Sequence, residues 1–131
     1  MTNFQPNYKL AAFGMLLLAA GIALGAFGAH GLKNIATEKY VDVFETGVRY
    51  QVYTALGLIV LSLFGEKLFR PSLLIIAGMW IFSVSLYFLS LNETWGSFLK
   101  KLGAITPIGG LLMIAGWCWA AVLTVRMARK A

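Results

Sequence analysis

Four long apolar stretches divide this 131-residue chain and constrain its fold more than any other feature. They cover about residues 10–29, 48–65, 72–91 and 107–125. A helix needs about 20 apolar residues to cross about 30 Å of hydrocarbon at a rise of 1.5 Å per residue. Because a backbone in lipid must satisfy its own amide groups, each stretch predicts a helix. We therefore expect one domain, residues 1–131, folded as an all-α membrane protein with a bundle of four transmembrane helices.

The composition favours lipid over water as the surrounding medium. Hydrophobic residues make up 60% of the chain and charged residues 12%, against about half and about a quarter in soluble domains. The net charge of +6 does not indicate nucleic-acid binding, because the basic residues are scattered in ones and twos between the apolar stretches. Basic residues beside spans are typical membrane anchors. The expected partner is the lipid bilayer, not nucleic acid.

Local signals mark where the helices begin. Pro71 falls in the first turn of the third helix, where its missing N–H costs nothing. Thr106 and Pro107 predict the start of the fourth helix, with Thr106 capping free amide groups and Pro107 at the first helical position. The first apolar stretch is longer than the core of a signal peptide, so we expect it to be retained as a span.

The segment 37–47, before the second stretch, has an amphipathic pattern. Tyr40, Val43 and Phe44 recur at helical spacing, while Glu38 and Asp42 lie elsewhere around the axis. The pattern predicts a helical segment that either lies on the membrane surface or extends the second helix.

Basic residues also predict an orientation. Four spans place both termini on one side of the membrane. That side holds Lys9, Lys67, Arg70, Arg126, Arg129 and Lys130, and the other holds Lys33, Lys39, Arg49, Lys100 and Lys101. Since cytoplasmic loops carry the excess of Lys and Arg, we expect cytoplasmic termini.

Glycines recur at intervals of seven residues, and one pair forms a GxxxG motif. This spacing keeps small residues on one seam, where helices in lipid can approach closely. The seams predict packing within the bundle, and the alternative is a seam that forms a homo-oligomer. The residues are Gly14, Gly21, Gly25 and Gly28 in the first stretch and Gly109, Gly110 and Gly116 in the fourth.

Threading the chain through four spans brings several polar residues towards the membrane face opposite the termini. They are His30, Tyr50, Gln51, Ser85, Tyr87 and Thr106. Polar groups at one level of a bundle can share a hydrogen-bond network, or each can cap a helix end separately. Gln51 is the most informative, because an amide at the membrane edge needs partners. For His30 we expect bonds to loop carbonyls, with pH sensing or ligand binding as the alternative.

No recognisable catalytic set stands out. Cys118 and His30 are the only cysteine and histidine, which excludes an internal disulfide relay, a cysteine-rich zinc site and a bis-histidine haem site within one chain. No HExxH motif is present, and the glutamates fall at span boundaries or in loops. We therefore expect no enzyme activity, metal or cofactor.

Two functions are consistent with these features. The first is a non-enzymatic accessory or interaction subunit, either self-associated or bound to another membrane protein. The alternative is a binder or conductor of a small molecule, lipid or proton through the polar residues above.

Several stretches resemble a family of small bacterial inner-membrane proteins, the YgdD/YwdK type. They are GAFGAHGL from Gly25 to Leu32, Thr46-Gly47 with Tyr50-Gln51, Phe82-Ser83 with Ser85-Leu-Tyr87, ITPIGG from Ile105 to Gly110, and Gly116-Trp117. The stretches occur in the family's order over nearly the whole chain. The resemblance implies four spans and a plasma-membrane location, and it implies no activity.

The chain departs from the family pattern at two positions. The family commonly has a histidine where this chain has Thr54, and a glycine where it has Val84. If a pair of histidines acts in the family, this chain retains only His30.

Overall fold

The computed structural model describes residues 5–91 and 97–129, with side chains described at all of these except 97–100. The four long helices are α1 (Tyr8–His30), α2 (Glu38–Ser62), α3 (Phe69–Ser90) and α5 (Thr106–Ala128). Three short 3-10 helices, η1 (Leu32–Asn34), η2 (Gly65–Leu68) and η3 (Ser97–Ala104), lie beside them. The prediction of an all-α bundle of four helices is confirmed for this part of the chain.

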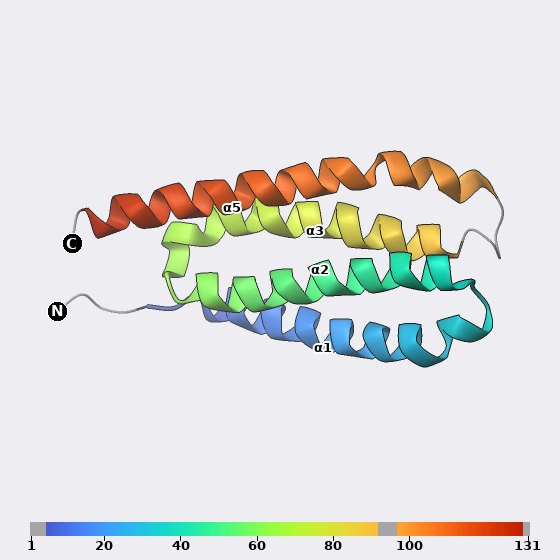
Figure 1. The fold of residues 1–131 in the computed structure, drawn as a ribbon. Coiled ribbons are helices and arrows are strands. Elements are labelled where there is room, and N and C mark those ends of the chain that lie inside the picture. Colours follow the sequence, from blue (N-terminus) through green and yellow to red (C-terminus); the bar gives the residue numbers. More distant parts are fainter. Residues whose placement is uncertain (1–4, 92–96, 130–131) are drawn as a thin grey trace.

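Each long helix runs antiparallel to the next one along the chain (Figure 1). The main packing pairs are α1 with α2, α2 with α3, and α3 with α5. As a result, α2 and α3 are central, whereas α1 and α5 lie at the two edges. The start of α1 and the end of α5 lie at the same end of the bundle (Figure 1), as an even number of antiparallel helices requires.

Three of the long helices meet the requirements for crossing a membrane. Together with adjoining turns they cover Tyr8–Asn34, Gly65–Ser90 and Lys101–Ala128, and each is long and apolar enough to span a bilayer. Within the described residues, α2 is not among them. The first half of α2 carries five charged side chains, namely Glu38, Lys39, Asp42, Glu45 and Arg49, which lower its mean hydropathy.

The amphipathic segment 37–47 extends the second helix rather than forming a separate one. Helix α2 begins at Glu38 and continues to Ser62 without interruption. Its first turns are held by packing, because Val41 and Phe44 are buried in a cluster with Leu32. The polar residues of this segment are therefore built into the end of the bundle near η1.

The helices approach one another closely at glycines. A methyl group added at Gly14 would lie 3.0 Å from the Ala55 carbonyl oxygen, and one added at Gly109 would lie 2.5 Å from the Phe82 amide nitrogen. Among the seven predicted packing glycines, Gly14, Gly21, Gly28, Gly109 and Gly116 make such tight contacts, whereas Gly25 and Gly110 leave room for a methyl group at 3.5 and 3.7 Å. All of these contacts lie within one chain.

Helix α5 does not begin as the sequence predicted. Thr106 is its first residue, but no side-chain bond caps the helix, and η3 precedes it with only Ile105 between them. Backbone bonds bridge the junction, since the amide nitrogens of Ile108 and Gly109 both donate to the Ile105 carbonyl. Because η3 and these backbone bonds already order the chain before α5, the helix start needs no side-chain cap. The capping role predicted for Thr106 is therefore wrong.

The N-terminal segment is tied to the turn between α2 and α3. Asn7 caps α1 by accepting from the Leu10 amide over 3.0 Å, and its side-chain nitrogen donates to Glu66 over 2.9 Å. The Asn7 backbone nitrogen donates to the Ser62 carbonyl over 2.8 Å. Gly65 has a positive φ of 64° at this turn, a conformation that glycine adopts without strain.

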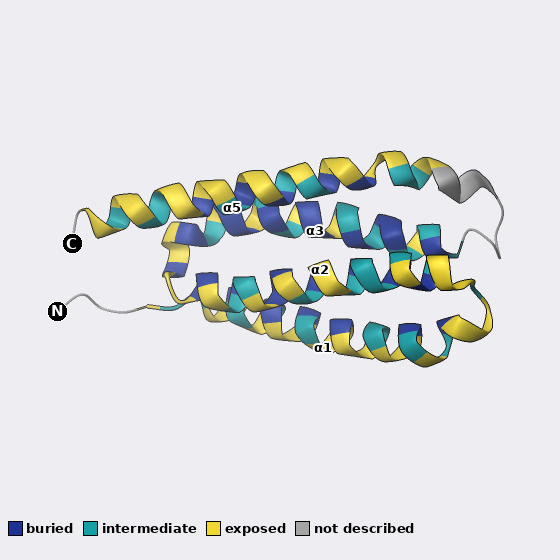
Figure 2. Ribbon diagram, viewed as in Figure 1, coloured by how far each residue is buried: buried dark blue, intermediate teal, exposed yellow. Residues whose placement is uncertain are grey.

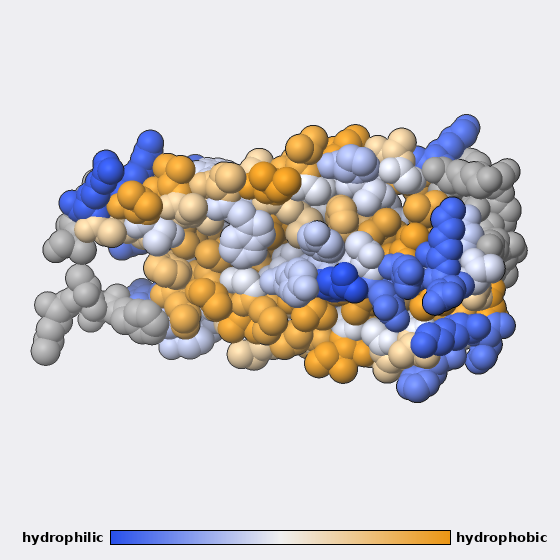
Figure 3. Space-filling view, viewed as in Figure 1, coloured by the Kyte–Doolittle hydropathy of each residue, from blue (hydrophilic) through white to orange (hydrophobic). Residues whose placement is uncertain are grey.

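The outer surface of the bundle is apolar between its ends. The outward faces of α1 and α5 are largely exposed (Figure 2), and large hydrophobic residues such as Leu16, Ile22, Leu111 and Ile114 lie on them. Hydrophilic residues gather mainly towards the two ends of the molecule (Figure 3). Such a surface is suited to hydrocarbon, because in water an exposed apolar area of this extent would drive association.

Candidate functional site

Gln51 lies inside the bundle with both ends of its amide hydrogen-bonded. Its side chain is 5% exposed. The Nε2 group donates to the Leu17 carbonyl of α1 over 3.0 Å, and Oε1 accepts from the Tyr87 hydroxyl of α3 over 2.8 Å. One side chain of α2 therefore joins both of its neighbouring helices. Since an unpaired amide in an apolar interior is costly, these bonds stabilise this arrangement of α1, α2 and α3.

A second polar pair joins α3 to α5. The hydroxyl oxygens of Ser85 and Thr106 lie 2.7 Å apart. Each also lies near a carbonyl of the preceding turn, 2.8 Å from Phe82 for Ser85 and 3.2 Å from Leu102 for Thr106. Two hydroxyls carry two protons, so two of these three bonds form at a time. The pair satisfies itself and leaves little capacity for a ligand.

The other two predicted residues lie apart from these pairs. His30 is exposed at the end of α1, and it is its backbone carbonyl that accepts the Asn34 side-chain amide over 3.3 Å. Tyr50 is 41% exposed. Its ring packs against those of Phe82 and Tyr53, with centroids 4.8 and 5.9 Å apart. The six predicted residues thus form two separate pairs and two single positions.

The depth of Gln51 differs from the position that the sequence predicted. Because α2 starts at Glu38, Gln51 lies roughly 20 Å along the helix from that start, at 1.5 Å per residue. Its partner Leu17 is likewise in the interior of α1 rather than at an end. The polar bonds of Gln51 therefore lie well inside the bundle, not at the beginning of the second helix.

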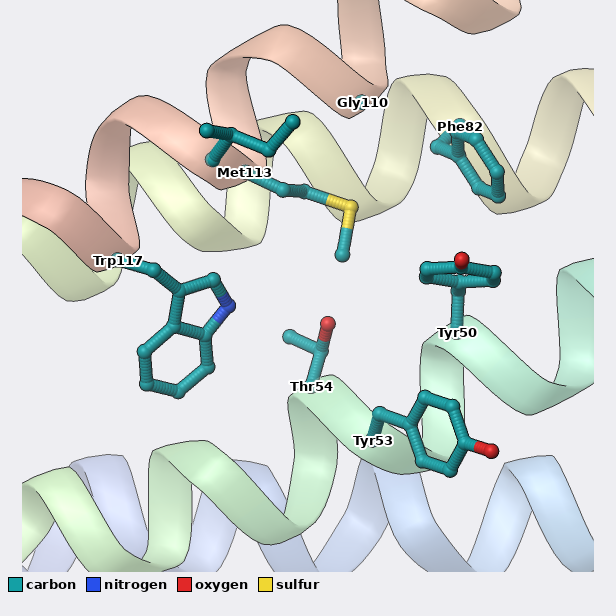
Figure 4. Close-up of a pocket in the computed structure, with 8 residues that line it drawn as sticks. Tyr50, Tyr53, Thr54, Phe82, Gly110, Met113 and Trp117 are labelled. Carbon is teal, nitrogen blue, oxygen red and sulfur yellow. The ribbon is translucent and has the colours of Figure 1, made fainter.

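A lateral groove lies between α2, α3 and α5, and the sequence did not predict it. Its volume is about 460 Å³. Figure 4 shows α2 on one side and α5 on the other, with α3 behind. The groove is lined by Tyr50, Tyr53, Thr54, Phe82, Gly110, Met113, Ile114 and Trp117. Its rim is open to the surrounding medium, since Tyr53 and Ile114 are 58% and 61% exposed.

Thr54 is the unusual residue of this lateral groove. The residue is 1% exposed, and its hydroxyl has no hydrogen-bond partner among the described residues. Several other helical hydroxyls bond back to their own helix, as Thr46 does to Asp42 and Thr124 does to Ala120, both over 2.9 Å. In Figure 4 the Thr54 hydroxyl points between Met113, Trp117 and Tyr50. The only sequence signal for Thr54 was its place as a departure from the family pattern.

The end of the lateral groove is shaped by a close approach of α2 and α5. A side chain at Gly57 would collide with the ring of Trp117. Gly57 therefore lets the indole lie across α2, where its aromatic face becomes one wall of the groove. Figure 4 shows the indole nitrogen on the side of the ring that faces Thr54.

The lining of the lateral groove is mostly apolar and aromatic. None of its lining residues carries a charge. Within residues 5–91 and 97–129, no group of three or more His, Cys, Asp or Glu side chains is placed to hold a metal ion. Aromatic rings, the Met113 thioether and the unpaired Thr54 hydroxyl can hold an apolar molecule and one of its polar atoms.

These features together define a small multi-pass helical membrane protein with an internal polar network and a lateral groove. Comparison with known proteins gives the same class. A family model described as "Protein of unknown function (DUF423)" matches residues 24–110, which is more than half of the chain. The chain belongs to this family, and the resemblance predicted from its motifs is confirmed.

The curated relatives are membrane proteins of comparable length. The UPF0382 membrane protein YwdK of Bacillus subtilis is 43% identical over 116 residues, covering 84% of this chain and 89% of the relative. A UPF0382 membrane protein of Staphylococcus haemolyticus is 40% identical over 117 residues, covering 86% and 92%. No solved structure matches the chain.

Proposed function

We propose that this membrane protein acts by binding rather than by catalysis, and that it holds a small amphipathic molecule of the bilayer in the lateral groove. The observation that carries the proposal is the unpaired, buried Thr54 hydroxyl in a groove lined mainly by apolar and aromatic side chains. Leaving a buried hydroxyl without a partner costs about 1–3 kcal/mol. A ligand that supplies the missing hydrogen bond recovers that cost on binding.

The absence of catalysis is part of the same proposal. The predicted polar residues that are buried already bond to one another or to the backbone, as Gln51 and Ser85 do. His30, the one histidine of the chain, lies at the end of α1 and does not line the groove. A general base within reach of a bound molecule is therefore missing from the groove lining.

An accessory or interaction subunit is the second candidate. The observation that favours it is the position of α1 and α5, each of which has its main long-helix contacts with one neighbour. Only 22% of the most apolar window of each is buried within the chain. A partner membrane protein or a second copy could cover these faces, although the tight glycine contacts are already used inside the bundle.

We also propose a bacterial plasma membrane as the location and cytoplasmic termini as the orientation. The bacterial relatives support the first, and the distribution of basic residues supports the second.

Filling the lateral groove should remove the bound molecule. A methyl group at Gly110 would meet only the ring of Phe82, at 3.7 Å, so Gly110→Leu adds bulk to the groove without forcing α3 and α5 apart. We expect native mass spectrometry of the wild-type protein from nanodiscs to show one chain carrying a small-molecule mass. We expect Gly110→Leu to lose that mass while keeping its helix content by circular dichroism.

The matched control is Gly25→Leu, because Gly25 also leaves room for a side chain but lies on α1, outside the groove. This variant should keep the bound mass. Two or more chains in one complex, with no small molecule attached, would contradict the binding proposal and support the interaction subunit instead.

A further inference from the structure

The properties of the lateral groove specify the class of molecule that it holds. We propose that the ligand is a neutral, ring-bearing lipid with a carbonyl oxygen, of the isoprenoid-quinone type, and that this oxygen accepts a hydrogen bond from Thr54. This inference rests on the proposed binding function and narrows it to one ligand class.

The first step concerns charge. The groove lining contains no acidic or basic side chain. A charged headgroup placed there would lose its hydration without gaining a counter-ion, at a cost far above that of a neutral polar group. Phospholipid headgroups and ionised fatty acids are therefore unsuitable, whereas a carbonyl needs only one hydrogen-bond donor.

The second step concerns depth. Thr54 lies about 12 Å from the nearer end of α2 at Ser62 and about 24 Å from the other end at Glu38, at 1.5 Å per residue. The adjacent Ala55 packs in the same buried cluster as Met79, which lies at the middle of α3. A lipid anchored by its headgroup at the membrane surface has only acyl chain at this depth. The ligand must instead carry its polar atom into the bilayer interior, as neutral quinones do.

The third step concerns shape. Tyr50 and Phe82 contribute ring walls on one side, with their centroids 4.8 Å apart, and Trp117 forms the wall at the Gly57 end. Aromatic walls favour a flat ring, because stacked or edge-on ring pairs gain about 0.5–1.5 kcal/mol beyond simple burial. The groove volume of about 460 Å³ lies in the range typical of small-molecule sites. An isoprenoid tail can leave through the open rim.

The fourth step concerns access to Thr54. Figure 4 shows the thioether of Met113 reaching towards the Thr54 hydroxyl, which is buried as a result. Methionine is unbranched and has three rotatable bonds, so its end adapts readily to a neighbour. A ring entering from the rim displaces the end of Met113 and brings its carbonyl to the hydroxyl.

The test uses the full chain in nanodiscs of phosphatidylethanolamine and phosphatidylglycerol, with an azido-naphthoquinone as photolabel and peptide mapping as the readout. We expect labelling of the groove segments of α2 and α5 around Thr54 and Met113. Thr54→Val keeps the side-chain shape and removes the hydroxyl, so labelling there should fall about 2- to 10-fold, as expected for the loss of one hydrogen bond.

Ser83→Ala is the matched control. Its hydroxyl is also buried without a partner, but Ser83 does not line the groove. We expect quinone labelling to be unchanged in this variant. Both variants should keep wild-type helix content, since each replaces an unpaired hydroxyl with an apolar group.

Other outcomes separate this inference from the proposed function. Groove labelling that Gly110→Leu abolishes and Thr54→Val leaves unchanged would refute recognition by Thr54 and leave binding intact. Groove labelling by a diazirine fatty acid, with none by the quinone, would refute the ligand class alone. Labelling spread over the outer faces of α1 and α5 and insensitive to Gly110→Leu would refute both.

Discussion

Alanine at Gly109 should destabilise the bundle by about 2–3 kcal/mol, the upper part of the range for overpacked sites. The added methyl group would lie 2.5 Å from the Phe82 amide nitrogen and 2.7 Å from the Gly78 carbonyl oxygen. Both obstacles are backbone atoms, so no side-chain rotation relieves the contact and α3 must separate from α5. The separation also stretches the bond between Ser85 and Thr106. Unfolding in mixed detergent micelles, followed by circular dichroism, measures the loss.

Gly110→Ala is the control for this prediction, because it makes the same chemical change one residue along the same helix. Its methyl group would meet only the Phe82 ring, at 3.7 Å. Alanine also has a higher helix propensity than glycine by about 1 kcal/mol, so this variant should be as stable as wild type or slightly more stable. Equal destabilisation of the two variants would show that α3 and α5 do not pack through Gly109.

Leucine at Gln51 should cost about 1–3 kcal/mol, because it leaves the half-buried Tyr87 hydroxyl without its acceptor. The bond from Gln51 to the Leu17 carbonyl is lost as well. Tyr87→Phe removes only the bond between Tyr87 and Gln51 and should cost less. The same unfolding measurement in mixed micelles gives both values.

The double variant Gln51→Leu with Tyr87→Phe isolates the bond between the two side chains. Neither side chain then has an unpaired polar group at this contact, so the double variant should be more stable than the sum of the single losses predicts. Strict additivity of the two losses would mean that Gln51 and Tyr87 do not interact, and that Gln51 does not link α1 to α3.

Hydropathy was sufficient to predict four helices, because long apolar stretches in lipid have to form helices. The start of α2 at Glu38 could not be predicted from hydropathy alone. The charged residues from Glu38 to Arg49 make this segment polar. The segment is held in place as part of α2 by the packing of Val41 and Phe44 against Leu32. A window of sequence does not contain those contacts.

The candidate site was only partly accessible to sequence reasoning. Gln51 was recognisable because an amide in an apolar setting needs partners, and its partners proved to be Leu17 and Tyr87. The role of Thr54 was not recognisable, since a threonine inside a helix usually bonds to its own backbone. Its unpaired state and its place in the groove depend on how α2, α3 and α5 pack against one another.

The central claim is that α2 crosses the membrane between its neighbours despite its polar first half. Single cysteines at Asn34 and Lys67 test this most directly, because both residues are exposed and lie beyond opposite ends of α2. They are introduced in a Cys118→Ser background, since Cys118 is the only native cysteine, and labelled in intact cells with a membrane-impermeant maleimide. We expect labelling at Asn34 without permeabilisation and at Lys67 only after it. Labelling of both positions from the same side would show that α2 does not cross, and would contradict the account.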